Sequence, residues 1–197
     1  ECYRKKERRI AAVSCNSSHQ GKKISAKCNL WKDLRSQAEN GELDYIFHLG
    51  DQIYVDDPGD ESSDNAYLMM TQLWSEGNRD DWEQDKEGIR NAIRRVYRKT
   101  WGKDEDVRAT LANVPNLMIA NDHEIRSHWP DRENDCDKES WEYFWSLQCK
   151  YVYYQYQRQL WEDVDFDRID EIDHEYHYHT FGDMGVFFLD MRFARSW

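Results

Sequence analysis

Three short polar segments, rich in residue types that bind metals, each follow an apolar run. They are Ser14-Cys15-Asn16, Gly50-Asp51-Gln52-Ile53-Tyr54 and Asn121-Asp122-His123-Glu124. If the apolar runs are parallel strands, these segments lie at the carboxyl ends of the strands, where open α/β sheets form their sites. We therefore expect the three segments to converge on one place and to form a metal site there.

The ligand types in these segments indicate which metals would bind. The thiol of Cys15 and the phenol of Tyr54 favour trivalent iron or a similar ion, whereas carboxylate and amide oxygens favour calcium, magnesium or manganese. Two metals need a bridging carboxylate, and Asp51 in its Gly-Asp turn is the best candidate. Such a pair generates hydroxide at neutral pH and stabilises the attacking and leaving oxygens of an in-line displacement.

The elements that must position these segments follow from hydrophobic periodicity. Residues 10–15 and 44–50 are short apolar runs typical of buried parallel strands, and residues 30–39 between them have the apolar spacing of a helix. This order predicts the strand–helix–strand unit of a layered α/β sheet. Residues 116–120 predict a third strand, and the composition of residues 51–64 indicates a loop.

The remaining segments predict two long helices and a hairpin. Apolar residues are spaced for a helix over 80–100, and a second helix over 136–160 has an aromatic stripe that favours a packing face over a cofactor site. Residues 174–181 and 185–190 predict an antiparallel hairpin. We therefore expect an α/β fold: one layered, mixed β-sheet with helices on both faces, in a single domain over residues 1–197.

Composition and charge exclude several classes of protein. A chain of 197 residues with 14% aromatic residues is folded in spite of its net charge of -12. It has no apolar run long enough for a transmembrane helix and no visible signal peptide. The acidic body argues against nucleic acid as a partner. Residues 1–35, with ten Lys or Arg against three Asp or Glu, form either a solvated face or a contact for a partner or phosphorylated substrate.

Two blocks of the sequence resemble a known family. Residues 47–57, with their Gly50-Asp51-Gln-Ile-Tyr54 core, and residues 121–126, followed by Trp129, resemble the PhoD-like branch of the calcineurin-type metallophosphoesterases. Ser14-Cys15 agrees with this branch, and residues 186–192 resemble a family strand that ends in Asp-x-Arg. The resemblance extends over about residues 10–195. It implies a metallophosphoesterase-like fold and a hydrolase of phosphomonoesters or phosphodiesters, in which metal-bound hydroxide attacks phosphorus in line.

The resemblance also implies a set of metal ligands. Cys15 and Tyr54 would bind an iron-like ion, and Asp51 would bridge it to a second metal, often calcium in this family or another divalent ion. Asp122 stands where the superfamily places a metal-binding Asn, and Asn121 is a further candidate ligand. The cofactors implied are therefore two or more metal ions, with iron and calcium expected.

Catalytic roles are implied in the same way. His123 stands where the superfamily places a His on the phosphate side of the metals, which would stabilise the transition state or protonate the leaving group. Arg126 is a candidate phosphate contact, because a guanidinium fits phosphate oxygens. Asp51 acts through the metals that it bridges, and Asp56 and Asp57 are candidates of lower rank.

The chain departs from the family pattern near its C-terminal end. The superfamily supplies further ligands from a Gly-Asp-x-His motif and a later His-containing motif, but Gly182-Asp183-Met184-Gly185 lacks the His. We therefore expect an incomplete catalytic domain, in which the other ligands lie outside this sequence, come from a separate segment, or are lost.

The alternative function is a non-catalytic interaction module on a degenerate or partial phosphatase fold. A third possible function is that of a metalloenzyme that acts on another ester class. Substrate, metal identity, oligomeric state and compartment stay open, and the resemblance slightly favours an extracellular or secretory location.

Two further patterns suggest metal binding but fit it poorly. His177 and His179 lie on one face of a predicted strand, yet no carboxylate of known position joins them, which favours a supporting role. Residues 163–174 begin like an EF-hand loop, but Arg168 replaces the required Gly and His174 replaces the Glu. This acidic segment is therefore typical of a solvated loop.

Overall fold

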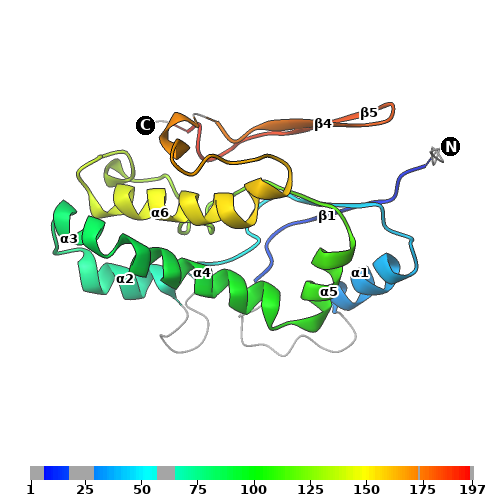
Figure 1. Ribbon diagram of the computed structural model, residues 1–197, viewed down its shortest axis with the longest axis horizontal. Helices are drawn as coiled ribbons and strands as arrows, with labels where there is room; N and C mark the ends of the chain where they lie inside the picture. Colours follow the sequence, from blue (N-terminus) through cyan, green and yellow to red (C-terminus); the bar gives the residue numbers. More distant parts are fainter. Residues whose placement is uncertain (1–6, 18–28, 57–64, 173, 196–197) are drawn as a thin grey trace.

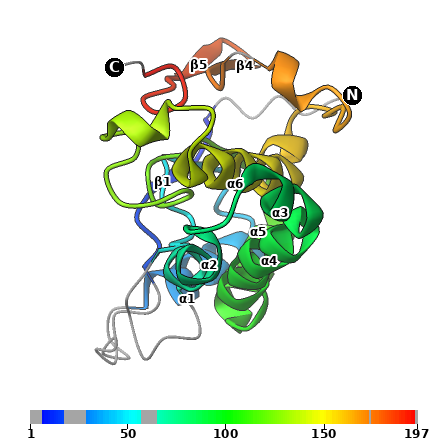
Figure 2. The same ribbon diagram turned by 90° about the vertical axis from the view of Figure 1, so that its left-hand side faces the viewer.

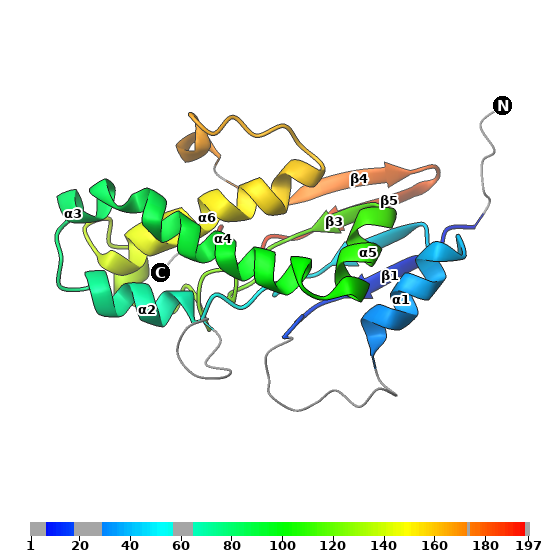
Figure 3. The ribbon, with the colours of Figure 1, turned by 60° about the horizontal axis from the view of Figure 1, so that its bottom comes forward.

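The computed structural model of the chain describes residues 7–17, 29–56, 65–172 and 174–195. Three parallel strands form its main sheet, in the order β1 (Ile10–Val13), β2 (Tyr45–His48) and β3 (Asn116–Met118). Helix α1 (Leu30–Glu39) lies between β1 and β2 in sequence. The predicted strand–helix–strand unit and the third strand are therefore confirmed (Figure 3).

Helix α1 covers one face of the parallel sheet. Its side chains Leu34 and Ala38 pack against Ile46 of β2. Asn29 caps the helix, because its side chain accepts a hydrogen bond from the amide of Lys32. Helix α5 (Glu105–Asn113) runs beside α1, and Arg35 joins the two helices through ion pairs with acidic residues of α5 (Figure 3).

A hairpin covers the other face of the sheet. Strands β4 (His177–Phe181) and β5 (Met184–Phe188) pair in antiparallel fashion, as predicted, and the aromatic side chains of Phe181 and Phe188 pack on Phe47 of β2. The α/β class of the fold is confirmed. Within the part of the chain that the structure describes, the hairpin pairs only with itself and stacks on the parallel sheet as a separate layer. Its inward-facing side chains, which include Phe181, Val186 and Phe188, pack against the parallel sheet.

A layer of helices extends from the sheet and gives the molecule an elongated shape (Figures 1 and 3). Figure 2 looks along this long axis, with the helical layer toward the viewer. It consists of α2 (Ala66–Trp74), α3 (Arg79–Gln84), α4 (Lys86–Gly102) and α6 (Trp141–Tyr156). Ile89, Ile93 and Val96 of α4 recur at helical spacing and pack in one core with Trp145 and Val152 of α6. Among the described residues, no helix combines the length and apolar character needed to cross a membrane.

The helix boundaries differ from the predicted ones for local reasons. The helix predicted over 80–100 is two helices that meet at Asp85, and a capping box at Asn78 starts the first of them. The helix predicted over 136–160 starts later, because the Ser140 side chain accepts a hydrogen bond from the amide of Tyr143. Short 3-10 turns flank it, η1 (Glu133–Asp135) and η2 (Arg158–Leu160); a third, η3 (Ile169–Glu171), follows in the acidic segment.

Helices α2 and α5 were not expected from periodicity, because each is only nine residues long and buries few side chains. Their capping residues are the signal that could have found them. Asn65 accepts a hydrogen bond from the amide of Leu68, and Asp104 accepts from the amides of Asp106 and Val107.

His177 fixes the hairpin to the sheet. Its ring stacks between those of Trp161 and Phe188, with centroid distances of 4.1 and 4.4 Å. Its Nε2–H donates to the carbonyl of Met118 (3.2 Å), and its Nδ1 accepts from Nε2 of His179 (2.7 Å). Burial, with the nearby His179 and Arg158, lowers the pKa of His177 to about 4.

We predict that His177 makes the fold sensitive to acid. An unfolded His has a pKa of about 6.5, so the unfolded chain binds more protons between pH 6.5 and 4, and stability falls as the pH drops through that range. His177→Gln should reduce this fall in the free energy of unfolding by roughly 2 kcal/mol. Urea denaturation at pH 7 and pH 4.5 measures the difference. An equally steep fall in the variant would contradict the prediction.

Candidate metal centre

The loops that follow β1, β2 and β3 meet at one place. The amide of Cys15 donates to the carbonyl of Gly50 (3.1 Å), and the amide of Asn16 donates to the carbonyl of Asp51 (2.8 Å). Gly50 has a φ of +103°, and a Cβ at this position would lie 2.4 Å from the Cβ of Asn121. Only glycine permits both this conformation and this approach.

Asp51 is the centre of the group that these loops form. Its Oδ2 lies 3.5 Å from Sγ of Cys15 and accepts a hydrogen bond from Nδ2 of Asn121 (3.2 Å). Its Oδ1 accepts from the amide of His123 (3.2 Å). The residue is 4% exposed. The carboxylate of Asp51 thus joins its own segment to the other two.

The backbone is strained at two of these positions. Cys15 and Asp51 have φ values of +58° and +57°, in the left-handed region that non-glycine residues seldom adopt. Each such conformation costs of order 1 kcal/mol or more and persists where the surrounding structure enforces it, which is common at functional sites. Here it turns the thiol and the carboxylate toward each other at the ends of adjacent strands.

Tyr54 completes a cluster of acidic groups. Burial raises the pKa of its phenol well above the usual value, and the charges of Asp51 and Cys15 raise it further. Among the described residues, no Lys or Arg forms an ion pair with Asp51. A thiol, a carboxylate and a phenol without such a partner combine soft and hard donors and could bind a cation such as iron.

His123 lies on the other side of Tyr54, with 4.2 Å between the ring centroids. Its Nδ1–H donates to Oδ1 of Asp56 (2.8 Å), and Oδ2 of Asp56 accepts from the amide of Ser127 (2.5 Å). Burial opposes protonation of His123, but the hydrogen bond and charge of Asp56 raise its pKa above the usual value. The bond to Asp56 occupies Nδ1 and leaves Nε2 as the nitrogen that can exchange a proton with a substrate.

Asp122 turns away from Asp51. Its carboxylate accepts hydrogen bonds from Nη2 of Arg192 (3.0 Å) and from the amide of His128 (2.5 Å). Arg192 also donates through Nε to Oδ1 of Asn121 (2.6 Å), so this guanidinium holds both side chains. The sequence patterns give Arg192 no role. Its place in the Asp-x-Arg pattern is the signal that could have pointed to it.

Arg126 does not reach this group. Its guanidinium is buried and forms ion pairs with Asp131 (2.8 Å) and Asp135 (2.5 Å), and it also donates to the carbonyl of Ser127. The candidate phosphate contact is thus already occupied by two carboxylates, whereas Arg192 holds the position beside Asn121 and Asp122. Asp57 lies outside the described residues.

The helical core anchors the loops that carry the site. Ile53 and Val55 alternate with Tyr54 and Asp56 along the loop after β2, and both are fully buried among the helices. Ile125, one residue after Glu124, is buried in the same helical core and anchors the loop after β3. The core therefore fixes the backbone on both sides of Tyr54 and anchors the loop after β3 beyond His123.

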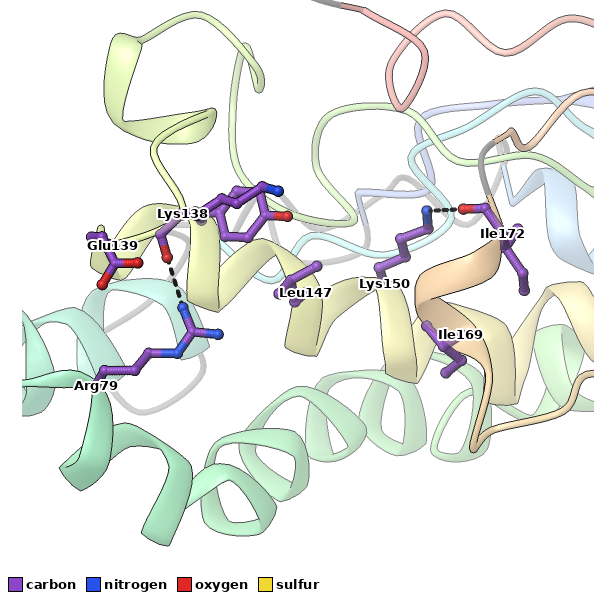
Figure 4. Close-up of a pocket in the computed structure, with 8 residues that line it drawn as sticks. Arg79, Lys138, Glu139, Leu147, Lys150, Ile169 and Ile172 are labelled. Carbon is purple, nitrogen blue, oxygen red and sulfur yellow. Dashed lines mark hydrogen bonds between the residues drawn. The ribbon is translucent and has the colours of Figure 1, made fainter.

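A separate groove of about 590 Å³ lies along the outer side of α6 (Figure 4). Leu147, Ile169 and Ile172 line it, together with basic residues that include Arg79 and Lys150. Arg79 donates to the carbonyl of Lys138, and Lys150 donates to that of Ile172. No candidate site residue lines this groove. Among the described residues, no cluster of three or more His, Cys, Asp or Glu side chains is arranged to hold a metal.

We predict that Arg126 serves stability. Arg126→Leu would leave the fully buried carboxylate of Asp135 without its cation and should lower the free energy of unfolding by about 3–5 kcal/mol. The control Arg132→Leu removes an exposed partner of Asp131 and should cost no more than about 1 kcal/mol. Chemical denaturation measures both. An Arg126 variant of normal stability that binds inorganic phosphate more weakly would instead support the phosphate contact.

Comparison with known proteins places the chain in a family. A sequence model of the PhoD-like phosphatases matches residues 10–197. The chain is also similar to a solved structure of PhoD, with 18% sequence identity and a TM-score of 0.55. This match covers 95% of the present chain and 32% of the PhoD chain. Comparison with curated proteins gives no match.

The two matches have different weight. At 18% identity the likeness to PhoD shows a shared fold, and the chain spans about a third of that structure. The family match extends over nearly the whole sequence and confirms the resemblance that we drew from residues 47–57 and 121–126. The chain belongs to the PhoD-like phosphatase family.

Proposed function

We propose that this protein takes part in metal-dependent hydrolysis of phosphomonoesters or phosphodiesters, with the metals held at Asp51. The observation that carries the proposal is the convergence of Cys15, Asp51 and Tyr54 at the ends of two adjacent strands, with no Lys or Arg paired to Asp51 among the described residues. Family membership supports the phosphoester substrate class. The chain spans about a third of the PhoD structure, and the complete reaction is therefore part of the proposal.

The donor chemistry assigns each candidate ligand to an ion. Cys15 and Tyr54 would bind iron, since thiolate and phenolate suit a trivalent ion, and Asp51 would bridge to a second ion such as calcium. Asn121 lies within hydrogen-bond distance of Asp51 and is the better-placed partner for that ion. Asp122 could join only by exchanging its bond with Arg192. When bound, the ions would polarise the phosphate ester and activate water for attack on phosphorus.

The protein's own groups would manage the proton and the geometry. His123 has a raised pKa and a free Nε2, so it is suited to donate a proton to the leaving oxygen. Asp56 holds the imidazole in this tautomer and orientation through the bond to Nδ1. No side chain need form a covalent intermediate, because the nucleophile is water.

Asp51→Asn tests the metal centre. An amide cannot supply the bridging charge, so the variant should lose bound metal together with activity toward a chromogenic phosphodiester. Elemental mass spectrometry of protein purified without chelator measures the metals, and we expect two or more per wild-type chain, including iron. The exposed Asp183→Asn in the β4–β5 turn is the control. Full activity in Asp51→Asn would refute the assignment, and a wild-type protein without metal after soaking would favour the interaction module.

Tyr54→Phe tests the iron ligand. The change removes one oxygen and keeps the ring that packs against His123, so the fold should persist. We expect weaker iron binding and loss of the visible absorption band that a phenolate gives on binding iron. Tyr176→Phe, an exposed position on the hairpin, should leave the spectrum unchanged. If the Tyr54 variant binds iron with an unaltered spectrum, Tyr54 is not its ligand.

A further inference from the structure

Glu124 is a buried carboxylate to which the sequence patterns assigned no role. It is 1% exposed, and no Lys or Arg among the described residues forms an ion pair with it. Instead, every contact of its carboxylate is a hydrogen bond from a neutral N–H donor. Glu124 directly follows His123 in the sequence. Its carboxylate contacts the backbone of the loops after β2 and β3, and it is not one of the candidate ligands.

Four donors share its two oxygens evenly. Oε2 accepts from the amides of Asp51 (3.1 Å) and Asn121 (2.9 Å). Oε1 accepts from the amide of Gln52 (2.7 Å) and from Nε2 of Gln157 (3.2 Å). The first three are backbone groups of the loops after β2 and β3. The side chain of Glu124 therefore joins the backbones of both loops at Asp51, Gln52 and Asn121.

Gln157 extends this connection into the helical core. It follows the last residue of α6, is fully buried, and also donates to the hydroxyl of Tyr97 in α4 (3.1 Å). The position of the two loops is thus set by the sheet on one side and by the ends of α4 and α6 on the other.

We propose that Glu124 is a positioning residue that clamps the loops after β2 and β3 and so sets the distance between Asp51 and Asn121. The inference rests on the proposed function only in its consequence, which is that the clamp sets metal affinity. The clamp itself is a property of the metal-free protein. Supporting groups of this kind change metal affinity 10- to 100-fold when they are removed.

Glu124→Gln is a stringent test because each oxygen accepts two N–H groups. Whichever way the amide is placed, its NH2 faces two donors, which lose their acceptor. In the metal-free protein at pH 8, hydrogen exchange at the amides of Asp51, Gln52 and Asn121 should accelerate about tenfold or more relative to the amide of Ile93 in α4. Iron or calcium affinity, measured by competition with a chelator, should fall at least about tenfold.

Two variants separate the clamp from a general loss of stability. Glu124→Asp keeps the charge, but its side chain is one methylene shorter and cannot span both loops. It should therefore show the same faster amide exchange and weaker metal binding as Glu124→Gln. Wild-type metal affinity in Glu124→Asp would show that the charge alone matters. Glu175→Gln alters another fully buried carboxylate, which pairs with Arg158 far from the candidate ligands in sequence. It should lower stability, leave exchange at the three loop amides unchanged relative to Ile93, and keep metal affinity within about twofold.

The outcomes distinguish the two proposals. The clamp would be overturned if the amides of Asp51, Gln52 and Asn121 exchanged in the wild-type protein as fast as unprotected amides. It would also be overturned if they exchanged in Glu124→Gln at the wild-type rate. If Glu124→Gln does not fold, the wild-type exchange rates and Glu124→Asp decide the question. If the wild-type protein binds neither iron nor calcium, the proposed function fails, and the exchange experiment still reports on Glu124.

Discussion

The close approach of the loops after β2 and β3 is the constraint on which the candidate site depends. A side chain at position 50 would collide with Asn121, so the approach exists only because that residue is glycine. It brings the backbone of Asp51 against that of the β3 loop, where the amide of His123 reaches the Asp51 carboxylate. Cys15 joins from β1 because the parallel pairing of β1 with β2 continues past the ends of the strands.

This arrangement is costly by itself, and the helical layer supplies the compensation. Two non-glycine residues adopt a left-handed conformation, and two carboxylates, Asp51 and Glu124, are buried. Burial raises the pKa of Glu124 to about 7, although four hydrogen bonds favour its charged form. Ile53, Val55 and Ile125 are buried among the helices, and each contributes roughly 1.5–3 kcal/mol. The strained loops of the candidate site are thus held in place by an apolar core.

The electrostatic arrangement separates two functions within a few residues. On one side of Tyr54, acidic groups face one another and would be stabilised by a cation. On the other side, Asp56 holds His123 in a form that readily carries a proton. The guanidinium of Arg192 holds the side chains of Asn121 and Asp122. In the proposed function, the first group would hold a cation and His123 would donate a proton, and both roles would assist hydrolysis of a phosphate ester.

The sequence by itself determined the strand–helix–strand order, the family and the segments that carry the site, because periodicity and short motifs are local properties of the chain. It indicated Arg126 as a phosphate contact, and only folding shows that Asp131 and Asp135 already occupy this guanidinium. The role of Glu124 was equally hidden, because three of its four partners belong to residues 51, 52 and 157, far away in sequence. The tertiary structure alone decided these partnerships, since contacts between distant segments depend on how the sheet and the helical layer pack together.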